Sequence, residues 1–205
     1  MPAFDLLTIG HSNVPAERFV AMLQQAGVGV VADVRSVPAS RHCPWFAKAN
    51  LTARLAQGDI GYSAMGDVLG GRPRGEHLYR DGIADYEAMA LRREFQVGLD
   101  RLQQAAARSL VCLMCAEREP LDCHRCLLVA RGLAERGLAV GHILYDGRVE
   151  PHAATEQRLL ALALEPETCD LFAAGQDSRL AAAYRRRSRA VAFRQRLDDF
   201  GSIHG

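Results

Sequence analysis

The 205-residue sequence lacks several features that would assign it to a specialised class of protein. It has no run approaching 18 consecutive apolar residues, which excludes a membrane-spanning helix. Its first residues have neither the basic flank nor the apolar stretch of a secretory signal, so we expect a cytoplasmic protein. The charges nearly cancel, with 25 lysines and arginines against 24 aspartates and glutamates. No overall field therefore selects a partner, and any electrostatic function must be local.

Common motifs of phosphate and cofactor binding are also missing. No predicted strand is followed by the glycine pattern of a P-loop or of a dinucleotide-binding fold, and we expect no cofactor. The loop of a cysteine phosphatase or rhodanese is absent as well. Arg118 is too close to Cys115 for such a loop, Arg125 is too far away, and no glycine lies between them.

Short apolar segments alternate with helical patterns over the first part of the chain. Buried strands are expected at about 4–9, 28–34, 109–114 and 138–144, with a shorter one at 60–62. This alternation predicts βαβ units and therefore an α/β fold. We expect a mostly parallel sheet of about five strands with helices on both faces.

The last part of the chain differs in composition. Over residues 149–205, leucines and alanines alternate with arginines, and no strand pattern occurs. We interpret residues 1–148 as the α/β core domain and residues 149–205 as a helical, arginine-rich C-terminal extension. Nucleic acid is a possible partner of Arg185, Arg189 and Arg196, but the neutral overall charge favours a helix docked on the core. Such a helix would pack Tyr184, Val191 and Leu197 and pair its arginines with Glu165, Glu167 and Asp198.

Polar and reactive residues follow four of the predicted strands. Ligands bind at the carboxyl ends of the strands in open α/β sheets, so these residues are expected to gather at one site. The expected substrate-binding residues are His11, Ser12, Arg35, Tyr62, Gly70, Gly71, His124 and Arg125. The expected catalytic residues are Cys115, Glu117, Cys123 and Asp33.

Four of the six cysteines fall within fifteen residues. Without a secretory signal, they are interpreted as thiols of a reducing compartment. Cys115 is expected at a strand end and Cys123 at a helix N-terminus, where free N–H groups lower the pKa of a thiol. Together with Glu117, these thiols suit nucleophilic or acid–base chemistry. Cys112 and Cys126 are expected to be buried as small apolar residues.

The same cysteines have the spacing of a four-cysteine zinc site, with Cys112-x-x-Cys115 and Cys123-x-x-Cys126. Residues three apart on a strand point to opposite faces, so Cys112 and Cys115 should not converge. We therefore expect no metal at a four-cysteine site. A looser site of Cys115, Cys123 and His124 stays open.

As a set, these residues resemble the uncharacterised family catalogued as domain of unknown function 488. The resemblance covers about residues 4–145 and implies an α/β fold, but it supplies no function. The matching segments are Thr8-Ile9-Gly10-His11-Ser12, Asp33-Val34-Arg35-Ser36-Val37-Pro38, Tyr62 with Leu69-Gly70-Gly71, Leu113-Met114-Cys115-Ala116-Glu117, Pro120, Cys123-His124-Arg125 and His142-Ile143.

These observations favour an enzyme that acts on a phosphate-bearing or nucleotide-like substrate. The expected partner is thus a small anionic or nucleotide-like ligand, and no membrane is involved. One alternative is a module that binds a nucleotide or nucleic acid without chemistry. The other is a structural cluster, in which pairs such as Asp33–Arg125 or Glu117–Arg35 tie the loops together.

Overall fold

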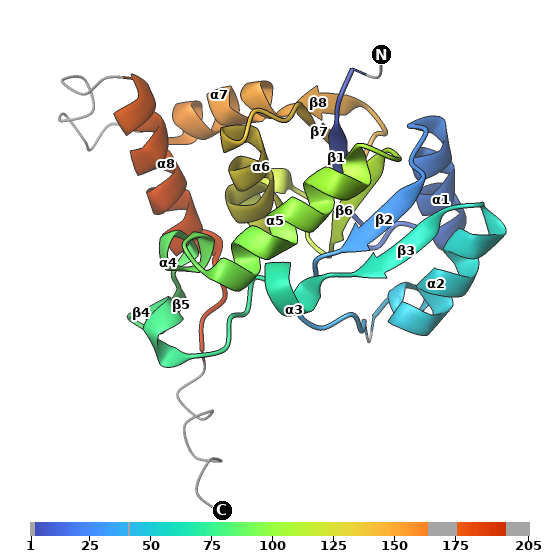
Figure 1. Ribbon diagram of the computed structural model, residues 1–205, viewed down its shortest axis with the longest axis horizontal. Coiled ribbons are helices and arrows are strands. Elements are labelled where there is room, and N and C mark those ends of the chain that lie inside the picture. Colours follow the sequence, from blue (N-terminus) through green and yellow to red (C-terminus); the bar gives the residue numbers. More distant parts are fainter. Residues whose placement is uncertain (1–2, 41, 164–175, 196–205) are drawn as a thin grey trace, which may run out of the picture.

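The structure of the protein, a computed structural model, describes residues 3–40, 42–163 and 176–195. Its centre is a six-stranded sheet in the order β3-β2-β6-β1-β7-β8 (Figure 1). The first five strands in this order run parallel, and β8 pairs antiparallel with β7. The expected α/β class is confirmed. The strands are β1 (Leu6–Gly10), β2 (Val30–Asp33), β3 (Gly61–Ala64), β6 (Val111–Cys115), β7 (Val140–Ile143) and β8 (Val149–Pro151).

The sheet has one strand more than expected, because β8 lies where no strand pattern was seen. Its three residues are too few to display an alternating pattern. The strand is held by its pairing with β7, in the register His142 opposite Glu150. A second, two-stranded ribbon of β4 (Tyr79–Arg80) and β5 (Ile83–Ala84) stands apart from the main sheet.

Helices cover both faces of the sheet, as a parallel sheet requires. One face is covered by α1 and α2, whose Phe19, Leu23 and Leu55 belong to one hydrophobic core. The other face is covered by α5 and the segment that follows β6, which form a second core (Figure 1). The helices are α1 (Ala16–Gln25), α2 (Lys48–Gln57), α3 (Gly66–Leu69), α4 (Tyr86–Ala90), α5 (Arg93–Ala106), α6 (Arg131–Glu135), α7 (His152–Ala163) and α8 (Gln176–Val191), with 3₁₀ turns η1 (Pro44–Phe46) and η2 (Glu76–Leu78).

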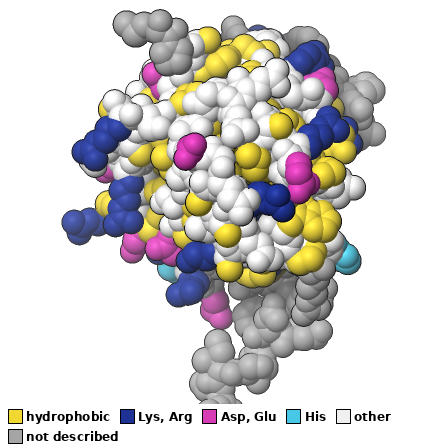
Figure 2. Space-filling model, turned by 90° about the vertical axis from the view of Figure 1, so that its right-hand side faces the viewer, with side chains coloured by type: hydrophobic (Ala, Val, Ile, Leu, Met, Phe, Trp, Pro, Cys, Tyr) yellow, Lys and Arg dark blue, Asp and Glu magenta, His cyan; other side chains and the backbone are white. Residues whose placement is uncertain are grey.

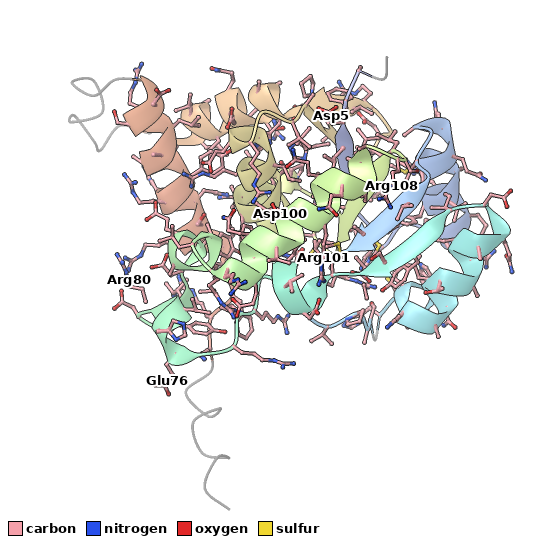
Figure 3. All side chains as sticks on the ribbon, in the orientation of Figure 1. Asp5, Glu76, Arg80, Asp100, Arg101 and Arg108 are labelled. Atoms are coloured by element: carbon pink, nitrogen blue, oxygen red, sulfur yellow. The ribbon has the colours of Figure 1, made fainter. Side chains whose placement is uncertain are left out.

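The helix α5 illustrates how the apolar pattern selects the buried face. Phe95, Leu99 and Leu102 recur at helical spacing and are buried. Asp100 and Arg101 lie on the exposed side of the same helix (Figure 3). The pattern therefore places α5 against the sheet with its charges in solvent.

The chain between β6 and β7 is irregular at the point that matters for the site. It forms a 3₁₀ turn, η3 (Pro120–Asp122), then a π-helical stretch, η4 (Arg125–Ala130), and then α6. All six residues of η4 are buried. Because π-helical stretches occur frequently at functional sites, the residues next to it, Cys123 and His124, are candidates for function.

The C-terminal helix α8 packs on the rest of the protein, as expected for a helix docked on the core. Ala183 and Tyr184 of α8 are buried. The arginines of α8 pair with carboxylates of the core, which differ from the expected ones. Glu165, Glu167, Asp198, Arg196 and Leu197 lie outside the described residues. The observed pairs are Arg185–Glu87, Arg187–Asp122 and Arg189–Asp81.

The face formed by α1 and α2 has no patch of one charge sign. Figure 2 shows positive and negative side chains scattered among apolar and uncharged ones on this side. Within the described part of the chain, no helix combines the length and the apolarity needed to cross a membrane.

Candidate functional site

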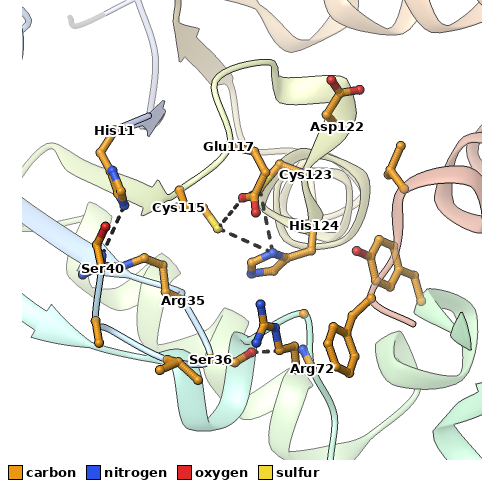
Figure 4. Close-up of a pocket in the computed structure, with 17 residues that line it drawn as sticks. His11, Arg35, Ser36, Ser40, Arg72, Cys115, Glu117, Asp122, Cys123 and His124 are labelled. Atoms are coloured by element: carbon orange, nitrogen blue, oxygen red, sulfur yellow. Dashed lines mark hydrogen bonds between the residues drawn. The ribbon is translucent and has the colours of Figure 1, made fainter. Parts of the chain in front are cut away.

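A pocket of about 420 Å³ opens at the carboxyl edge of the parallel strands. The strands β1 and β6 are neighbours, and the connections that leave them run toward opposite edges of the sheet. Such a switch point is where open α/β sheets bind ligands. We call this cavity the site pocket (Figure 4). Its polar lining includes His11, Arg35, Ser36, Ser40, Arg72, Cys115, Glu117, Cys123 and His124.

Four of these side chains meet on one wall, and we call Cys115, Glu117, Cys123 and His124 the thiol cluster. Oε2 of Glu117 lies 2.9 Å from Sγ of Cys115 and 3.0 Å from Sγ of Cys123. Nδ1 of His124 lies 3.7 Å and 3.8 Å from the same two sulfur atoms. The thiols and the imidazole are buried, whereas Glu117 is an exposed residue whose carboxyl group reaches inward (Figure 4). The cluster therefore faces the pocket on its Glu117 side.

Local structure explains why two cysteines eight positions apart meet. β6 ends at Cys115, and the turn η3 brings the chain back to Cys123. Glu119 caps this turn, since its Oε1 accepts a hydrogen bond of 3.2 Å from the backbone N–H of Leu121. Pro120 is the first residue of the turn, where its missing N–H costs nothing.

We call the segment between Cys115 and Cys123 the return loop. Arg125, whose side chain is fully buried, also holds this loop in place. Its Nη1 donates to the carbonyl oxygen of Glu117 at 2.6 Å, and its Nη2 donates to that of Arg118 at 3.1 Å. Gly10, at the end of β1, lies under this loop, and a Cβ there would overlap the carbonyl oxygen of Glu117. The position of the loop therefore depends on the missing side chain of Gly10 and on the hydrogen bonds of Arg125.

Burial and mutual contact shift the ionisation of the thiol cluster. The interaction with Cys123, together with burial, raises the pKa of Cys115 well above its ordinary value. Burial opposes ionisation of Cys123 too, but the Cys115 thiol, Arg125 and His124 lower its pKa. Burial also raises the pKa of Glu117. Burial would lower the pKa of His124, but its contact with Cys123 outweighs this and raises it. A thiolate is therefore favoured at Cys123 over Cys115.

A second group of polar residues is centred on Arg35, which lines the pocket. Asp33 accepts from Nε of Arg35 at 2.9 Å and from its Nη2 at 2.6 Å, and the hydroxyl of Tyr62 donates to it at 2.7 Å. Nη1 of Arg35 contacts Nε2 of His11 at 3.2 Å, while Nδ1 of His11 lies 2.8 Å from the carbonyl oxygen of Ser12. Burial lowers the pKa of His11 to about 4, so this imidazole is neutral at pH 7, with its proton on Nδ1. These contacts hold Arg35 in a fixed position at the pocket.

Not every expected site residue lines the pocket. Asp33 was expected as an acid or base, but Arg35 and Tyr62 occupy both of its oxygens. Arg125 was expected to bind an anion, but its guanidinium donates to backbone carbonyls instead. Among the described residues, neither of the two structural pairs expected from the sequence forms, and the buried ion pair is Asp33–Arg35. The lining includes His11, Arg35, Gly71 and the thiol cluster, but not Ser12, Asp33, Tyr62, Gly70 or Arg125.

The loop that contains Gly70 and Gly71, which we call the glycine-rich loop, brings a further arginine into the pocket. Gly71 packs on the ring of His124, where a Cβ would lie only 2.7 Å from Cγ of that ring. The next residue, Arg72, donates its backbone N–H to Oγ of Ser36 at 3.0 Å. Its guanidinium lies 4.7 Å from the ring centre of Phe193, in contact with the π face (Figure 4).

Several lining residues were not among the expected ones. Arg72 follows an expected glycine directly, and that position was the signal that could have identified it. Val191 and Phe193 come from the C-terminal extension, and no local pattern links them to a site more than sixty positions away. The extension therefore contributes a wall of the pocket.

Comparison with known families places these residues in a wider group of proteins. The family model described as "Domain of unknown function DUF488" matches residues 15–131. The chain belongs to this family. The segment matched by the DUF488 model contains the thiol cluster, Arg35 and Arg72, but neither His11 nor Phe193. The resemblance stated from the sequence is thereby confirmed. No curated protein and no solved structure matched the chain significantly.

Proposed function

We propose that the protein is an enzyme that acts on a small phosphate-bearing substrate bound in the site pocket. The phosphate group binds at Arg72 and Arg35, and the reacting group lies against the thiol cluster. The observation that carries this proposal is the direct contact of two thiols, a carboxyl group and an imidazole on the wall of a pocket that can hold a small molecule.

The thiol cluster supplies the groups that a reaction needs. Glu117 is positioned to transfer a proton, since its carboxyl group lies at the open side of the cluster, where a substrate enters. Proton transfer by a positioned side chain contributes typically about 10²–10⁴-fold to a rate. A purely structural cluster would not need to line a cavity, and this favours the enzyme over the structural alternative.

The arginines make phosphate the favoured recognition element. Arg35 is already paired with Asp33, and it offers only its remaining N–H donors. Arg72 has no carboxylate partner within ion-pair distance in the described part of the chain, although it lines the pocket. The hydroxyl groups of Ser36 and Ser40 line the same region. Such a set of donors fits the oxygens of a phosphate group.

Nucleic acid is less favoured as the partner. The arginines of α8 that would contact a phosphate backbone are paired with Glu87, Asp122 and Asp81. These exposed pairs are weak individually, but they direct the guanidinium groups toward the core.

The proposal is tested with nucleoside monophosphates and sugar phosphates, each compared with its unphosphorylated counterpart. Calorimetry should detect binding of the phosphorylated forms only. Arg72→Gln should weaken binding about 10- to 100-fold, the value of one charge-assisted hydrogen bond of about 1.5–3 kcal/mol. Arg108→Gln, in the exposed turn that follows α5 (Figure 3), serves as the matched control and should bind normally.

Turnover is then followed by mass spectrometry of the ligands that bind. The wild type should convert at least one of them, and Glu117→Gln should bind it but convert it at least about 100-fold more slowly. Binding without turnover by the wild type would identify a binding module instead of an enzyme. Equal binding by the Arg72 and Arg108 variants would contradict the assignment of the phosphate group.

A further inference from the structure

We propose that Cys115, Cys123 and His124 bind a zinc ion whose fourth coordination position faces the site pocket beside Glu117. Binding of the ion stands on the geometry alone, whereas its role as a reaction centre rests on the proposed function. The site differs from the four-cysteine arrangement suggested by spacing, since Cys112 belongs to the core on the opposite face of the sheet.

The three ligand atoms are spaced as a tetrahedral ion requires. Both sulfur atoms and Nδ1 of His124 lie within 4.8 Å of one another, and the two S–N distances are 3.7 Å and 3.8 Å. Zinc binds thiolates at about 2.3 Å and imidazole nitrogens at about 2.0–2.1 Å, which places neighbouring S and N ligands roughly 3.6 Å apart at a tetrahedral angle. The two observed S–N distances match this spacing to within about 0.2 Å.

The imidazole is fixed in the form that can bind a metal. Nε2 of His124 lies 2.9 Å from the carbonyl oxygen of Val34, at the end of β2. A carbonyl oxygen only accepts, so Nε2 carries a proton whether or not Nδ1 does, and loss of the Nδ1 proton on metal binding directs that lone pair toward the two sulfur atoms. Metal-binding histidines almost always donate their second N–H in this manner. Gly71, packed on the ring, further restricts its orientation.

Three groups of the thiol cluster become negatively charged when they lose a proton, and a cation between them would offset this charge. Cys115, Glu117 and Cys123 are each able to lose a proton, and the carboxyl oxygen lies within 3.0 Å of both sulfur atoms. The guanidinium of Arg125 donates to the backbone carbonyls of Glu117 at 2.6 Å and of Arg118 at 3.1 Å. A divalent ion satisfies both sulfur ligands at once, and thiolates with an imidazole are ligands that zinc prefers.

A second group of buried residues of metal-binding type differs from the proposed zinc ligands in its hydrogen bonds. Cys126, His142 and His152 also gather within 4.8 Å, but all four ring nitrogens of the two histidines have hydrogen-bond partners. Nδ1 of His142 meets Thr8 at 2.7 Å, its Nε2 meets Nδ1 of His152 at 2.9 Å, and Nε2 of His152 meets Tyr184 at 3.1 Å. This chain of hydrogen bonds leaves no lone pair for an ion, and we assign it no metal.

The coordination is of the open type. Three protein ligands with a free fourth position are typical of catalytic zinc, whereas structural zinc has four protein ligands. The pocket is lined by all three ligands and by Glu117, whose Oε2 is the oxygen that contacts both sulfur atoms. Glu117 therefore lies where it can bind the ion directly or accept a proton from a water molecule on it.

Cobalt(II) provides the probe, because thiolate-bound cobalt gives intense charge-transfer bands in the near ultraviolet. The protein is treated with a chelator under reducing conditions and titrated with cobalt, and zinc content is measured by mass spectrometry before treatment. The wild type should hold one ion per chain and give the thiolate bands, and zinc should displace cobalt from it. Glu117→Gln should still bind an ion, since three ligands remain.

The matched pair of variants is Cys115→Ala and Cys112→Ala. Both residues lie on β6, both are buried, and each substitution removes the same sulfur atom. The first should lose the cobalt bands, and the second should keep them. Circular dichroism verifies that both variants are folded, and the wild-type titration remains decisive if one of them is not.

The proposal is overturned if the wild type gives no thiolate bands, or if the two variants lose them equally. A Cys115–Cys123 disulfide found in untreated protein that binds no cobalt would overturn it too, and would identify a redox pair. Failure of the proposed function has a different signature, namely cobalt binding by a protein whose Arg72→Gln variant binds phosphorylated ligands as well as the wild type does.

Discussion

Nη1 of Arg125 donates a hydrogen bond of 2.6 Å to the carbonyl oxygen of Glu117. Through this contact, a residue that never reaches the pocket determines where the Glu117 carboxyl group lies. Arg125 is thus a positioning residue, because its guanidinium fork spans the carbonyls of Glu117 and Arg118 at the floor of the return loop. A lysine ammonium in its place has no fixed fork to reach both.

Arg125→Lys should lower the free energy of unfolding by about 1.5–3 kcal/mol, the value of one hydrogen bond from a charged group. It should also weaken metal binding by about 10- to 100-fold under conditions where the protein stays folded. Urea unfolding and a cobalt titration measure the two effects. Arg101→Lys, on the exposed side of α5, should change neither (Figure 3). Loss of stability without any change in cobalt affinity would reduce Arg125 to a structural role.

Gly71 allows the glycine-rich loop to contact the thiol cluster. The Cβ of an alanine would lie 2.7 Å from Cγ of His124, and this ring cannot retreat easily, because Nε2 is held by Val34. Gly71→Ala should therefore displace the loop that carries Arg72 and weaken the binding of phosphorylated ligands by at least tenfold, or about 1.4 kcal/mol. Gly61→Ala, on the exposed strand β3, is the control, because it lies outside the pocket lining and its nearest contact, Cγ2 of Val30 at 3.3 Å, is a side-chain atom. Calorimetry that finds both variants equal to the wild type would contradict this role.

The buried histidines His142 and His152 predict a loss of stability in acid. Burial lowers the pKa of both, so the unfolded chain binds protons near pH 6.5 that the folded protein does not take up. The stabilisation is complete above pH 6.5 and is lost as the pH falls below it, by at most about 1.4 kcal/mol per pH unit for each imidazole.

Urea unfolding at several pH values between 7 and 5 measures this slope. His142→Asn should have a shallower dependence than the wild type, although it is less stable at pH 7, because the bond to Thr8 is disturbed. An unchanged slope in this variant would show that other groups dominate the acid sensitivity.

The sequence predicted the parts of the site that depend on local pattern. Apolar runs located β1, β2 and β6, and their ends correctly placed His11, Arg35 and Cys115 at one edge. The alternation of side chains along a strand also separated Cys112 from Cys115, and the two belong to different cores.

The remaining features depend on partners that are distant in the sequence. The sequence around Arg125 does not indicate that its side chain points away from the pocket. That orientation depends on Gly10, which leaves space for the loop whose carbonyl oxygen at Glu117 accepts from Arg125. Asp33 pairs with Arg35 two positions later and does not line the pocket. Phe193 reaches the pocket only because α8 docks on the core.

The most direct test of the thiol cluster as a metal site is anomalous diffraction at the zinc absorption edge from crystals of the full chain grown with zinc. The coordination proposed here predicts one strong anomalous peak between Sγ of Cys115, Sγ of Cys123 and Nδ1 of His124, on the side that faces the site pocket. A map without a peak at this position, or with its strongest peak at Cys126, His142 and His152, would contradict it.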